Sequence, residues 1–313
     1  ARCRHRLHRN ALEGVFVNFD RVAAAPISWG ICEAPGWGLQ MSPERVLGEM
    51  RDAGIRATEL GALGWLPTDA AALRVMLADH GLDLVGGFVP LVLHRADRRA
   101  EMEADALTAA RTLAEGGGTC FVSAAVSSHE SWQHLDLDDE QWRTLVEGLD
   151  IVERICADHG LTQVVHPHVN TLIETAAEFD RFLADSTVRF CLDTGHLFIG
   201  GADPVAIARD HADRVGLVHI KDVDASVAAR MRAGEFDLMS ATVAGLFPAA
   251  GQGDVPIAAV VDQMEAAAFT GWYVLEQDVA LTDGEPPAGE GPVVGVRVSL
   301  DYLKSLDAPV AAS

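Results

Sequence analysis

The sequence predicts an α/β fold with a single (β/α)8 barrel, and three observations support this prediction. Short apolar runs alternate with amphipathic helical stretches eight times along the 313 residues. No linker or internal repeat divides the chain, and a barrel of this kind typically takes about 250 residues as one domain. No GxGxxG motif opens a helix, so the alternation favours a closed parallel barrel over an open nucleotide-binding sheet.

The order of the elements follows from the apolar runs and the helix boundary residues. The runs predict strands at residues 23–28, 55–60, 82–90, 118–124, 162–166, 188–193, 215–221 and 272–277. Helices are predicted at residues 42–54, 68–81, 97–115, 138–159, 174–185, 203–212, 256–268 and 293–306. The first helix should have Ser42 as N-cap, Pro43 at its first position and Gly54 as its stop, and the second should run from a Thr68 cap to Gly81.

The two ends of the chain differ in character. Residues 1–21 begin with the basic stretch ARCRHRLHRN, and the only apolar run that follows is the short VFVNF, too short for a secretory signal. We expect residues 1–21 to be a disordered basic extension and residues 22–313 to form the barrel domain. The stretch TDGEPPAGEGP at 282–292 is the one low-complexity segment, and it is predicted to be the last strand-to-helix loop.

Composition limits the partners that this chain can have. The net charge of −22 excludes the basic surface that a nucleic-acid-binding protein needs. No run of 18 apolar residues predicts a membrane span. The five cysteines are widely spaced without a CxxC motif, which is typical of reduced thiols, so we expect a cytoplasmic protein.

Four consecutive predicted strands end in side chains that can bind a metal ion. These strand ends carry His166 and His168, then Asp193 and His196, then His219, Lys221 and Asp222, and finally Glu276 and Asp278. One such residue is usually explained by packing or by a helix cap. Four neighbouring ends meet at one mouth of a barrel, where imidazoles and carboxylates stay unsatisfied unless a cation lies among them.

The mixture of ligand types indicates which metals suit the site. Imidazole with carboxylate favours a divalent ion such as Mn²⁺, Co²⁺, Fe²⁺ or Zn²⁺, and the lack of cysteine ligands argues against a structural zinc site. Lys221 follows His219 by two residues and therefore shares its face of the strand. There Lys221 can carry a proton or hold an enolate oxygen, or it can simply pair with a carboxylate.

The first strand-to-helix loop, PISWGICEAPGWG, combines tryptophan with glycine. Flat rings at a barrel mouth can stack on the C–H face of a cyclic polyol, which makes Trp29 and Trp37 candidate substrate contacts. Glu33 in this loop and Glu59 at the end of the second strand can bind substrate hydroxyls. The alternative is that the two tryptophans plug the top of the barrel and that Glu33 only holds a turn.

At these residues the chain resembles a known group of enzymes. CLDTGH, VHIKD and VLEQD, in this order on late strands, resemble the xylose isomerase-like TIM barrels, which include sugar phosphate isomerases and epimerases. The further motifs PISWGICEAPGWG, ATELG, VVHPHVNT and GQGDV are similar to those of the inosose (2-keto-myo-inositol) dehydratase branch. The resemblance covers residues 22–306.

The resemblance implies one divalent metal, Mn²⁺ or Co²⁺ first and Fe²⁺, Zn²⁺ or Mg²⁺ otherwise, with no nucleotide cofactor. It implies four metal ligands, which are His166, Asp193, His219 and Glu276. The superfamily mostly has Glu where this chain has His166; a histidine there is expected of inosose dehydratases, and the choice between His166 and His168 stays open. The implied reaction is dehydration of a cyclic polyol ketone. Lys221, His196 and His168 are candidate acid and base residues, with their roles left open.

Other functions remain possible on the same barrel. A metal-dependent sugar or keto-polyol isomerase or epimerase begins with the same proton abstraction and is the nearest alternative. A different dehydratase, a DNA-repair nuclease and a non-catalytic binding barrel are further ones; the net charge of −22 disfavours the nuclease. We expect a small polyol or sugar as the substrate, and a homo-oligomer is compatible with the fold.

Overall fold

The structure is a computed structural model that describes residues 18–34 and 36–306. Of the predicted extension at residues 1–21, residues 1–17 lie outside the described part, so for them the expectation stays a prediction. Phe19–Arg21 forms a 3-10 turn, and the Arg21 guanidinium donates to the carbonyl oxygens of Phe269 and Gly271 and to the Glu265 carboxylate. Residues just before the first strand therefore contact the barrel.

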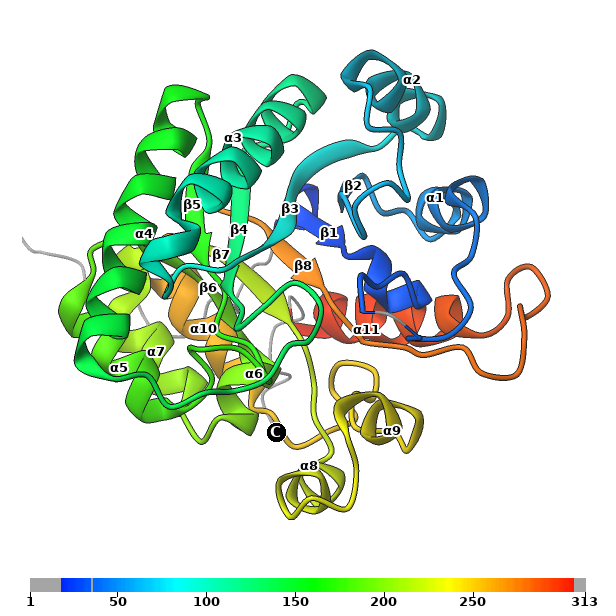
Figure 1. Cartoon of the computed structure of the whole chain (residues 1–313). Coiled ribbons are helices and arrows are strands. Elements are labelled where there is room, and N and C mark those ends of the chain that lie inside the picture. Colours follow the sequence, from blue (N-terminus) through cyan, green and yellow to red (C-terminus); the bar gives the residue numbers. More distant parts are fainter. Residues whose placement is uncertain (1–17, 35, 307–313) are drawn as a thin grey trace, which may run out of the picture.

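The described chain folds into a closed barrel of eight parallel strands in sequence order, with helices outside it (Figure 1). The predicted (β/α)8 barrel is therefore confirmed. The strands are β1 (Val22–Ala24), β2 (Ala57–Glu59), β3 (Asp83–Leu91), β4 (Cys120–Ala125), β5 (Thr162–Val165), β6 (Arg189–Asp193), β7 (Val215–Ile220) and β8 (Tyr273–Leu275). Strand β1 pairs with β8 through Ala23 and Val274, which closes the ring.

The eight predicted helices are present, with three more in the connections. The predicted ones are α1 (Pro43–Asp52), α2 (Ala70–His80), α3 (Arg99–Gly116), α4 (Asp139–Asp158), α5 (Ala176–Asp185), α7 (Pro204–His211), α10 (Ile257–Ala266) and α11 (Pro292–Leu306). The helices α6 (Thr194–Ile199), α8 (Ala225–Arg232) and α9 (Leu238–Val243) were not predicted. None of the helices in the described ranges is both long and apolar enough to cross a membrane.

Two predicted boundaries are wrong, each for a local physical reason. Ser42 caps α1 as expected, but α2 is capped by Asp69, whose carboxylate accepts from the Ala72 N–H, and not by Thr68. The first strand ends at Ala24, and residues Pro26–Trp29 form a 3-10 turn instead of continuing the strand. Proline has no N–H for a strand ladder, and its fixed φ suits the first position of such a turn.

The inside of the barrel is filled by alternate residues of all eight strands. This inner layer consists of Ala23, Ala25, Ala57, Val85, Cys120, Val122, Val164, Cys191, Leu217 and Val274. A larger apolar layer between strands and helices surrounds it. Because side chains alternate along a strand, residues two positions beyond the inner layer also face inward, toward the carboxyl-terminal mouth. This register positions the site.

Candidate metal centre and substrate pocket

Four polar side chains lie on the inner face, directly above the apolar layer. Each follows an inner-layer residue by two positions: His166 after Val164, Asp193 after Cys191, His219 after Leu217, and Glu276 after Val274. The β6–β7 register places Asp193 directly beside His219. All four side chains are buried, with at most 8% of the residue exposed. Strand period and barrel closure therefore suffice to bring them together.

The four side chains converge closely enough to share one ion. One ligand atom from each lies within 4.8 Å of the others. His166 Nε2 is 3.2 Å from Asp193 Oδ2, and His219 Nδ1 is 3.6 Å from the same oxygen. His168 is not part of this cluster. The structure thus places His166, and not its neighbour, beside the other three candidate ligands.

Unsatisfied atoms in the cluster fit a cation. His219 Nε2 contacts Glu59 Oε1 at 3.1 Å, so the ring proton sits on Nε2 and Nδ1 keeps a lone pair. That Nδ1 and Glu276 Oε2 lie in close contact, yet neither has a hydrogen-bond partner, and His166 Nδ1 lacks one too. Two buried lone pairs facing each other are costly without a positive charge between them. The donor set fits a divalent metal.

The carboxylates of the cluster are held ionised. Burial alone would raise the pKa of Asp193, but the Lys221 ammonium and the hydrogen bond from His166 hold it well below its usual value. Burial likewise opposes ionisation of Glu276, while the charge of the buried Lys221 favours it and lowers its pKa. Ionised carboxylates are what a divalent ion requires.

Lys221 lies behind the cluster, fully buried. Its Nζ donates to Asp278 Oδ1 at 2.7 Å and contacts His196 Nε2 at 3.0 Å. Burial lowers the pKa of Lys221, but the charges of Asp278, Glu276 and Asp193 outweigh it and raise the pKa above its usual value. A Cβ at Gly195 would lie 2.6 Å from Lys221 Cγ, so the glycine of the CLDTGH motif makes room for the lysine stem.

Asp222, the remaining strand-end acid, has a structural role. Its carboxylate accepts hydrogen bonds from the backbone N–H groups of Gly251, Gly253 and Val255. A Cβ at Gly253 would lie 2.4 Å from Asp222 Oδ1. The GQGDV motif therefore surrounds this carboxylate. Its hydrogen bonds to Asp222 join the start and the end of the β7–α10 connection, which contains α8 and α9.

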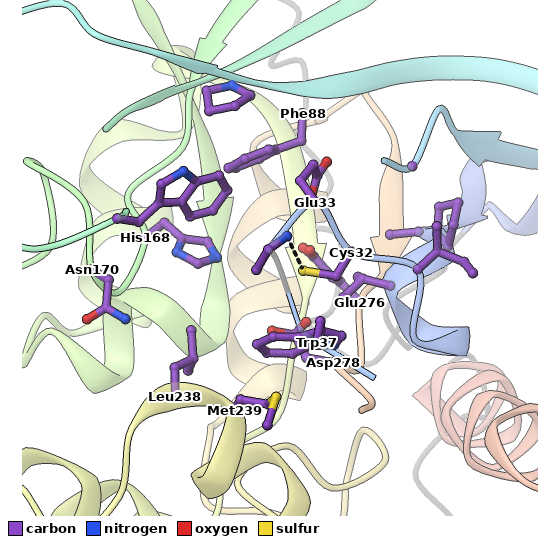
Figure 2. Close-up of a pocket in the computed structure, with 18 of the residues that line it drawn as sticks. Cys32, Glu33, Trp37, Phe88, His168, Asn170, Leu238, Met239, Glu276 and Asp278 are labelled. Atoms are coloured by element: carbon purple, nitrogen blue, oxygen red, sulfur yellow. Dashed lines mark hydrogen bonds between the residues drawn. The ribbon is translucent and has the colours of Figure 1, made fainter. Parts of the chain in front are cut away.

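A cavity of about 350 Å³ opens above the cluster (Figure 2). Glu276 and Asp278 lie toward its centre, Phe88 and His168 on one side, and Leu238 and Met239 from α9 below. Neither Lys221 nor His196 is among its lining residues. The cavity has the volume of a small-ligand site.

The four predicted substrate contacts have different positions. Glu59 and Trp37 line the cavity, and the Trp37 indole donates to the Val279 carbonyl at 2.8 Å. Glu33 lines it as well, and burial, followed by the charges of Glu276, Glu59 and Asp278, raises its pKa to about 7. The expectation for Trp29 needs correction, because this ring is fully buried and donates to Glu49 Oε2 at 2.9 Å. Trp29 is a core residue.

Several lining residues were not predicted. They include Phe88, Trp132, Asn170, Leu238, Met239 and, as a cavity residue, Asp278. Phe88 and Trp132 have ring centroids 5.4 Å apart, and Trp132 meets the His168 ring edge-on at 6.1 Å. Trp132 and Asn170 lie in loops, where no hydrophobic periodicity predicts the path of the chain. An isolated tryptophan in a polar loop, as in HESWQH, was the one available signal.

His168 is oriented by its own backbone. Its Nδ1 lies 2.6 Å from the Val169 carbonyl oxygen and must donate the proton, which leaves Nε2 as an acceptor. Burial, then the charges of His166 and Lys221, lowers the pKa of His168 to about 3. The ring is therefore neutral. His196 stacks on it with centroids 3.8 Å apart.

A family model described as "Xylose isomerase-like TIM barrel" matches residues 47–305. The chain belongs to this family. Its relatives include an inosose dehydratase of Geobacillus kaustophilus, 29% identical over 93% of this chain and 96% of the relative. The rhizopine catabolism protein MocC of Rhizobium meliloti is 32% identical over 86% of this chain and 83% of its own length. The chain is an enzyme of this superfamily.

Solved structures show the same fold at low identity. An L-ribulose 3-epimerase superposes with a TM-score of 0.67 at 18% identity, over 91% of this chain and 94% of that one. A probable 3-DHS dehydratase, AsbF from Bacillus anthracis, gives a TM-score of 0.66 at 13% identity, over 91% and 98%. These likenesses confirm the fold, and the buried His/Asp/His/Glu cluster is consistent with a metal site of the family.

Proposed function

We propose that this protein is a metal-dependent dehydratase of a cyclic polyol ketone, with 2-keto-myo-inositol as its substrate. One observation carries the proposal: the relative that matches nearly the whole chain is an inosose dehydratase, and the cavity above the metal cluster suits such a ring. Trp37, Phe88 and Trp132 offer flat apolar faces to the C–H groups of a ring. Glu33 and Glu59 offer acceptors to its hydroxyls.

The metal would be held by His166, Asp193, His219 and Glu276. A divalent ion there, Mn²⁺ or Co²⁺ in our proposal, supplies Lewis-acid polarisation of the ketone when bound. Glu59 fixes the His219 ring through Nε2 and so directs Nδ1 at the ion. The remaining chemistry, the movement of two protons, falls to groups of the chain.

We assign proton transfer to the groups that reach the cavity. His168 lines the cavity with Nε2 as an acceptor, so we assign to it the proton from the carbon next to the ketone. Asp278 lines the cavity, and burial raises its pKa to about 6, so it can give a proton to the hydroxyl that leaves the β carbon; Lys221 Nζ, 2.7 Å from Asp278 Oδ1, holds this carboxyl and resupplies the proton. The substrate loses one water, and the enol that remains is that of a dione. His196 lies behind and holds the Lys221 ammonium.

The test is an assay of the metal-loaded protein on 2-keto-myo-inositol. We expect loss of the ketone, appearance of a dione, and arrest by EDTA that added Mn²⁺ or Co²⁺ reverses. In D₂O, His168→Gln should slow deuterium uptake next to the ketone by about 10²-fold or more. A matched change outside the cavity, His159→Gln, should leave the rate unchanged.

Two results would overturn the proposal. A new isomeric ketose without loss of water, found in a panel of sugars and keto-polyols, would make the protein an isomerase or epimerase. Tightly bound metal with ligand binding but no turnover would make it a binding barrel. An unchanged exchange rate in His168→Gln would remove only the role assigned to that residue.

A further inference from the structure

One wall of the cavity comes from the β4–α4 connection, residues 126–138. This loop supplies His129, Glu130, Ser131 and Trp132 to the lining. The Trp132 ring contacts Phe88 on β3 and His168 after β5, so these three rings form one aromatic wall of the cavity. Within the loop, Ser127 and Ser128 hydroxyls donate to the Ser131 carbonyl and shape the turn. These local bonds do not attach the loop to the barrel.

His129 Nε2 lies 3.4 Å from Asp105 Oδ2 on α3. His134, two residues after Trp132, makes the closer and more buried attachment: its Nε2 lies 2.6 Å from Glu178 Oε1 on α5, and both side chains are partly buried. Glu178 is itself fixed, because its second oxygen accepts from the N–H groups of Glu174 and Thr175 in the α5 capping box. The partner of His134 is therefore anchored by a helix terminus and is not a mobile surface carboxylate.

The same network reaches a second wall residue. Glu174 Oε2 accepts from the Asn170 N–H at 2.8 Å, and Asn170 lines the cavity with a positive φ of 65°. A left-handed asparagine needs support from its surroundings. Hydrogen bonds thus connect His134, Glu178, Glu174 and Asn170, and they tie the β4–α4 and β5–α5 connections together beside the substrate cavity.

We propose that His134, through its ion pair with Glu178, is a positioning residue that holds Trp132 against the substrate and makes substrate affinity depend on pH. This inference rests on the proposed function, in that Trp132 is taken to contact a polyol ring. His134 does not line the cavity and lies outside the metal cluster, so it acts on binding and not on the chemical step.

The charges around His134 set the direction of the pH dependence. Glu178 and Glu174 face it from the α5 side and Asp136 from its own loop, while the nearby Arg181 is paired with Asp139 and Asp185. Burial lowers the pKa of His134, but the Glu178 hydrogen bond and these carboxylate charges outweigh it and raise the pKa above 6.5. The ion pair is complete below that raised pKa, and it is lost as the pH rises through it.

The attachment itself can be tested without turnover. In ¹³C-histidine-labelled protein, the His134 resonance should titrate above 6.5 in the wild type and fall toward the ordinary value in Glu178→Gln, whose amide keeps the capping box. Acrylamide should quench tryptophan fluorescence more strongly in His134→Ala, and the increase should vanish in the double variant with Trp132→Phe. An unshifted resonance, or an increase that persists without Trp132, would overturn the proposal even if no substrate is turned over.

Kinetics on 2-keto-myo-inositol test the consequence for binding. His134→Ala should raise KM about three- to tenfold with kcat changed less than twofold. In a Glu33→Gln background, which removes the cavity carboxyl with a pKa of about 7, KM should rise as the pH passes through the His134 pKa, and adding His134→Gln should remove this step. His80→Gln, a partly buried histidine on α2, is the matched control and should keep it. A fall in kcat at constant KM in His134→Ala, or a pH step that survives in His134→Gln, would contradict the role.

Discussion

The two halves of the barrel mouth are built differently. Strands β5–β8 carry the cluster side chains within the strand or one residue past its end, buried and close to one another. The β1–β4 half contributes cavity walls largely from connections, among them Glu33, Trp37 and Trp132. A ligand set on rigid strands keeps its geometry, whereas walls on loops can change without disturbing it. We propose that the β5–β8 ends carry the chemistry and that the β1–β4 connections share recognition with Asn170, Leu238 and Met239 of the other half.

The largest effect should follow from removing one charge on the β5–β8 side. Asp193→Asn should lose the metal and lower kcat/KM by about 10³-fold or more, because the ligand charge is gone. The asparagine can still cap α6, since Asp193 Oδ1 accepts from the Gly195 and His196 N–H groups. Elemental analysis and turnover measure the change. Asp203→Asn, the same substitution at the exposed α7 cap, should retain both metal and activity.

The next effect concerns proton supply. Lys221→Met should lower kcat by about 10²- to 10⁴-fold with metal retained, because the ammonium beside Asp278 is lost. The variant should also be less stable, since Asp278 is left buried and unpaired, and adding Asp278→Asn should recover part of that stability. Chemical denaturation and steady-state kinetics separate the two effects. An unchanged kcat in Lys221→Met would contradict the proton-supply role. Lys304→Met, at an exposed lysine, serves as the control.

Two tryptophans from the β1–β4 half give opposite expectations. Trp132→Ala should raise KM about two- to tenfold with little change in stability, because its ring is a wall of the cavity. Trp29→Phe should leave KM unchanged and lower the unfolding free energy by about 1–3 kcal/mol, because Glu49 loses a buried hydrogen bond. Michaelis kinetics and urea denaturation measure both. A raised KM for Trp29→Phe would contradict this assignment and would indicate that Trp29 contributes to substrate binding.

The smallest effect concerns Glu33 in the metal-free protein. Its folded pKa of about 7 lies above the ordinary value of 4.5, so the folded state binds the proton more tightly than the unfolded chain does. The stability contribution is present below 4.5 and is lost as the pH rises to about 7. The loss of stability between these values should be smaller in Glu33→Gln than in the wild type. Equal pH profiles by urea denaturation would show that Glu33 is not buried among carboxylates.

The difference between the strand ends and the connections also explains which site residues the sequence could predict. The four cluster residues follow from a period of two along strands that barrel closure brings together, and both rules act locally. Glu59 was predicted at the mouth for the same reason, although its contact with His219 was not. Lys221 was placed on the correct face, but its burial behind the cluster depends on the space that Gly195 leaves.

The walls could not be predicted in this way. Trp132 lines the cavity from a loop that contacts α5 through His134 and Glu178, two residues far apart in sequence. Leu238 and Met239 arrive on α9, a short helix in a connection whose start and end are joined by hydrogen bonds to Asp222. Trp29 was misplaced because Pro26 starts a 3-10 turn that directs the indole to Glu49 in the core. Contacts between loops have no periodic signature in one sequence.

The central claim is that the β5–β8 strand ends hold one catalytic metal ion. The most direct test is an anomalous difference map from a crystal of the protein loaded with Co²⁺. The account predicts one strong peak within bonding distance of His166, Asp193, His219 and Glu276, absent from Asp193→Asn crystals treated in the same way. No peak at these residues in an active, Co²⁺-loaded preparation, or a peak only at another group of side chains, would contradict it.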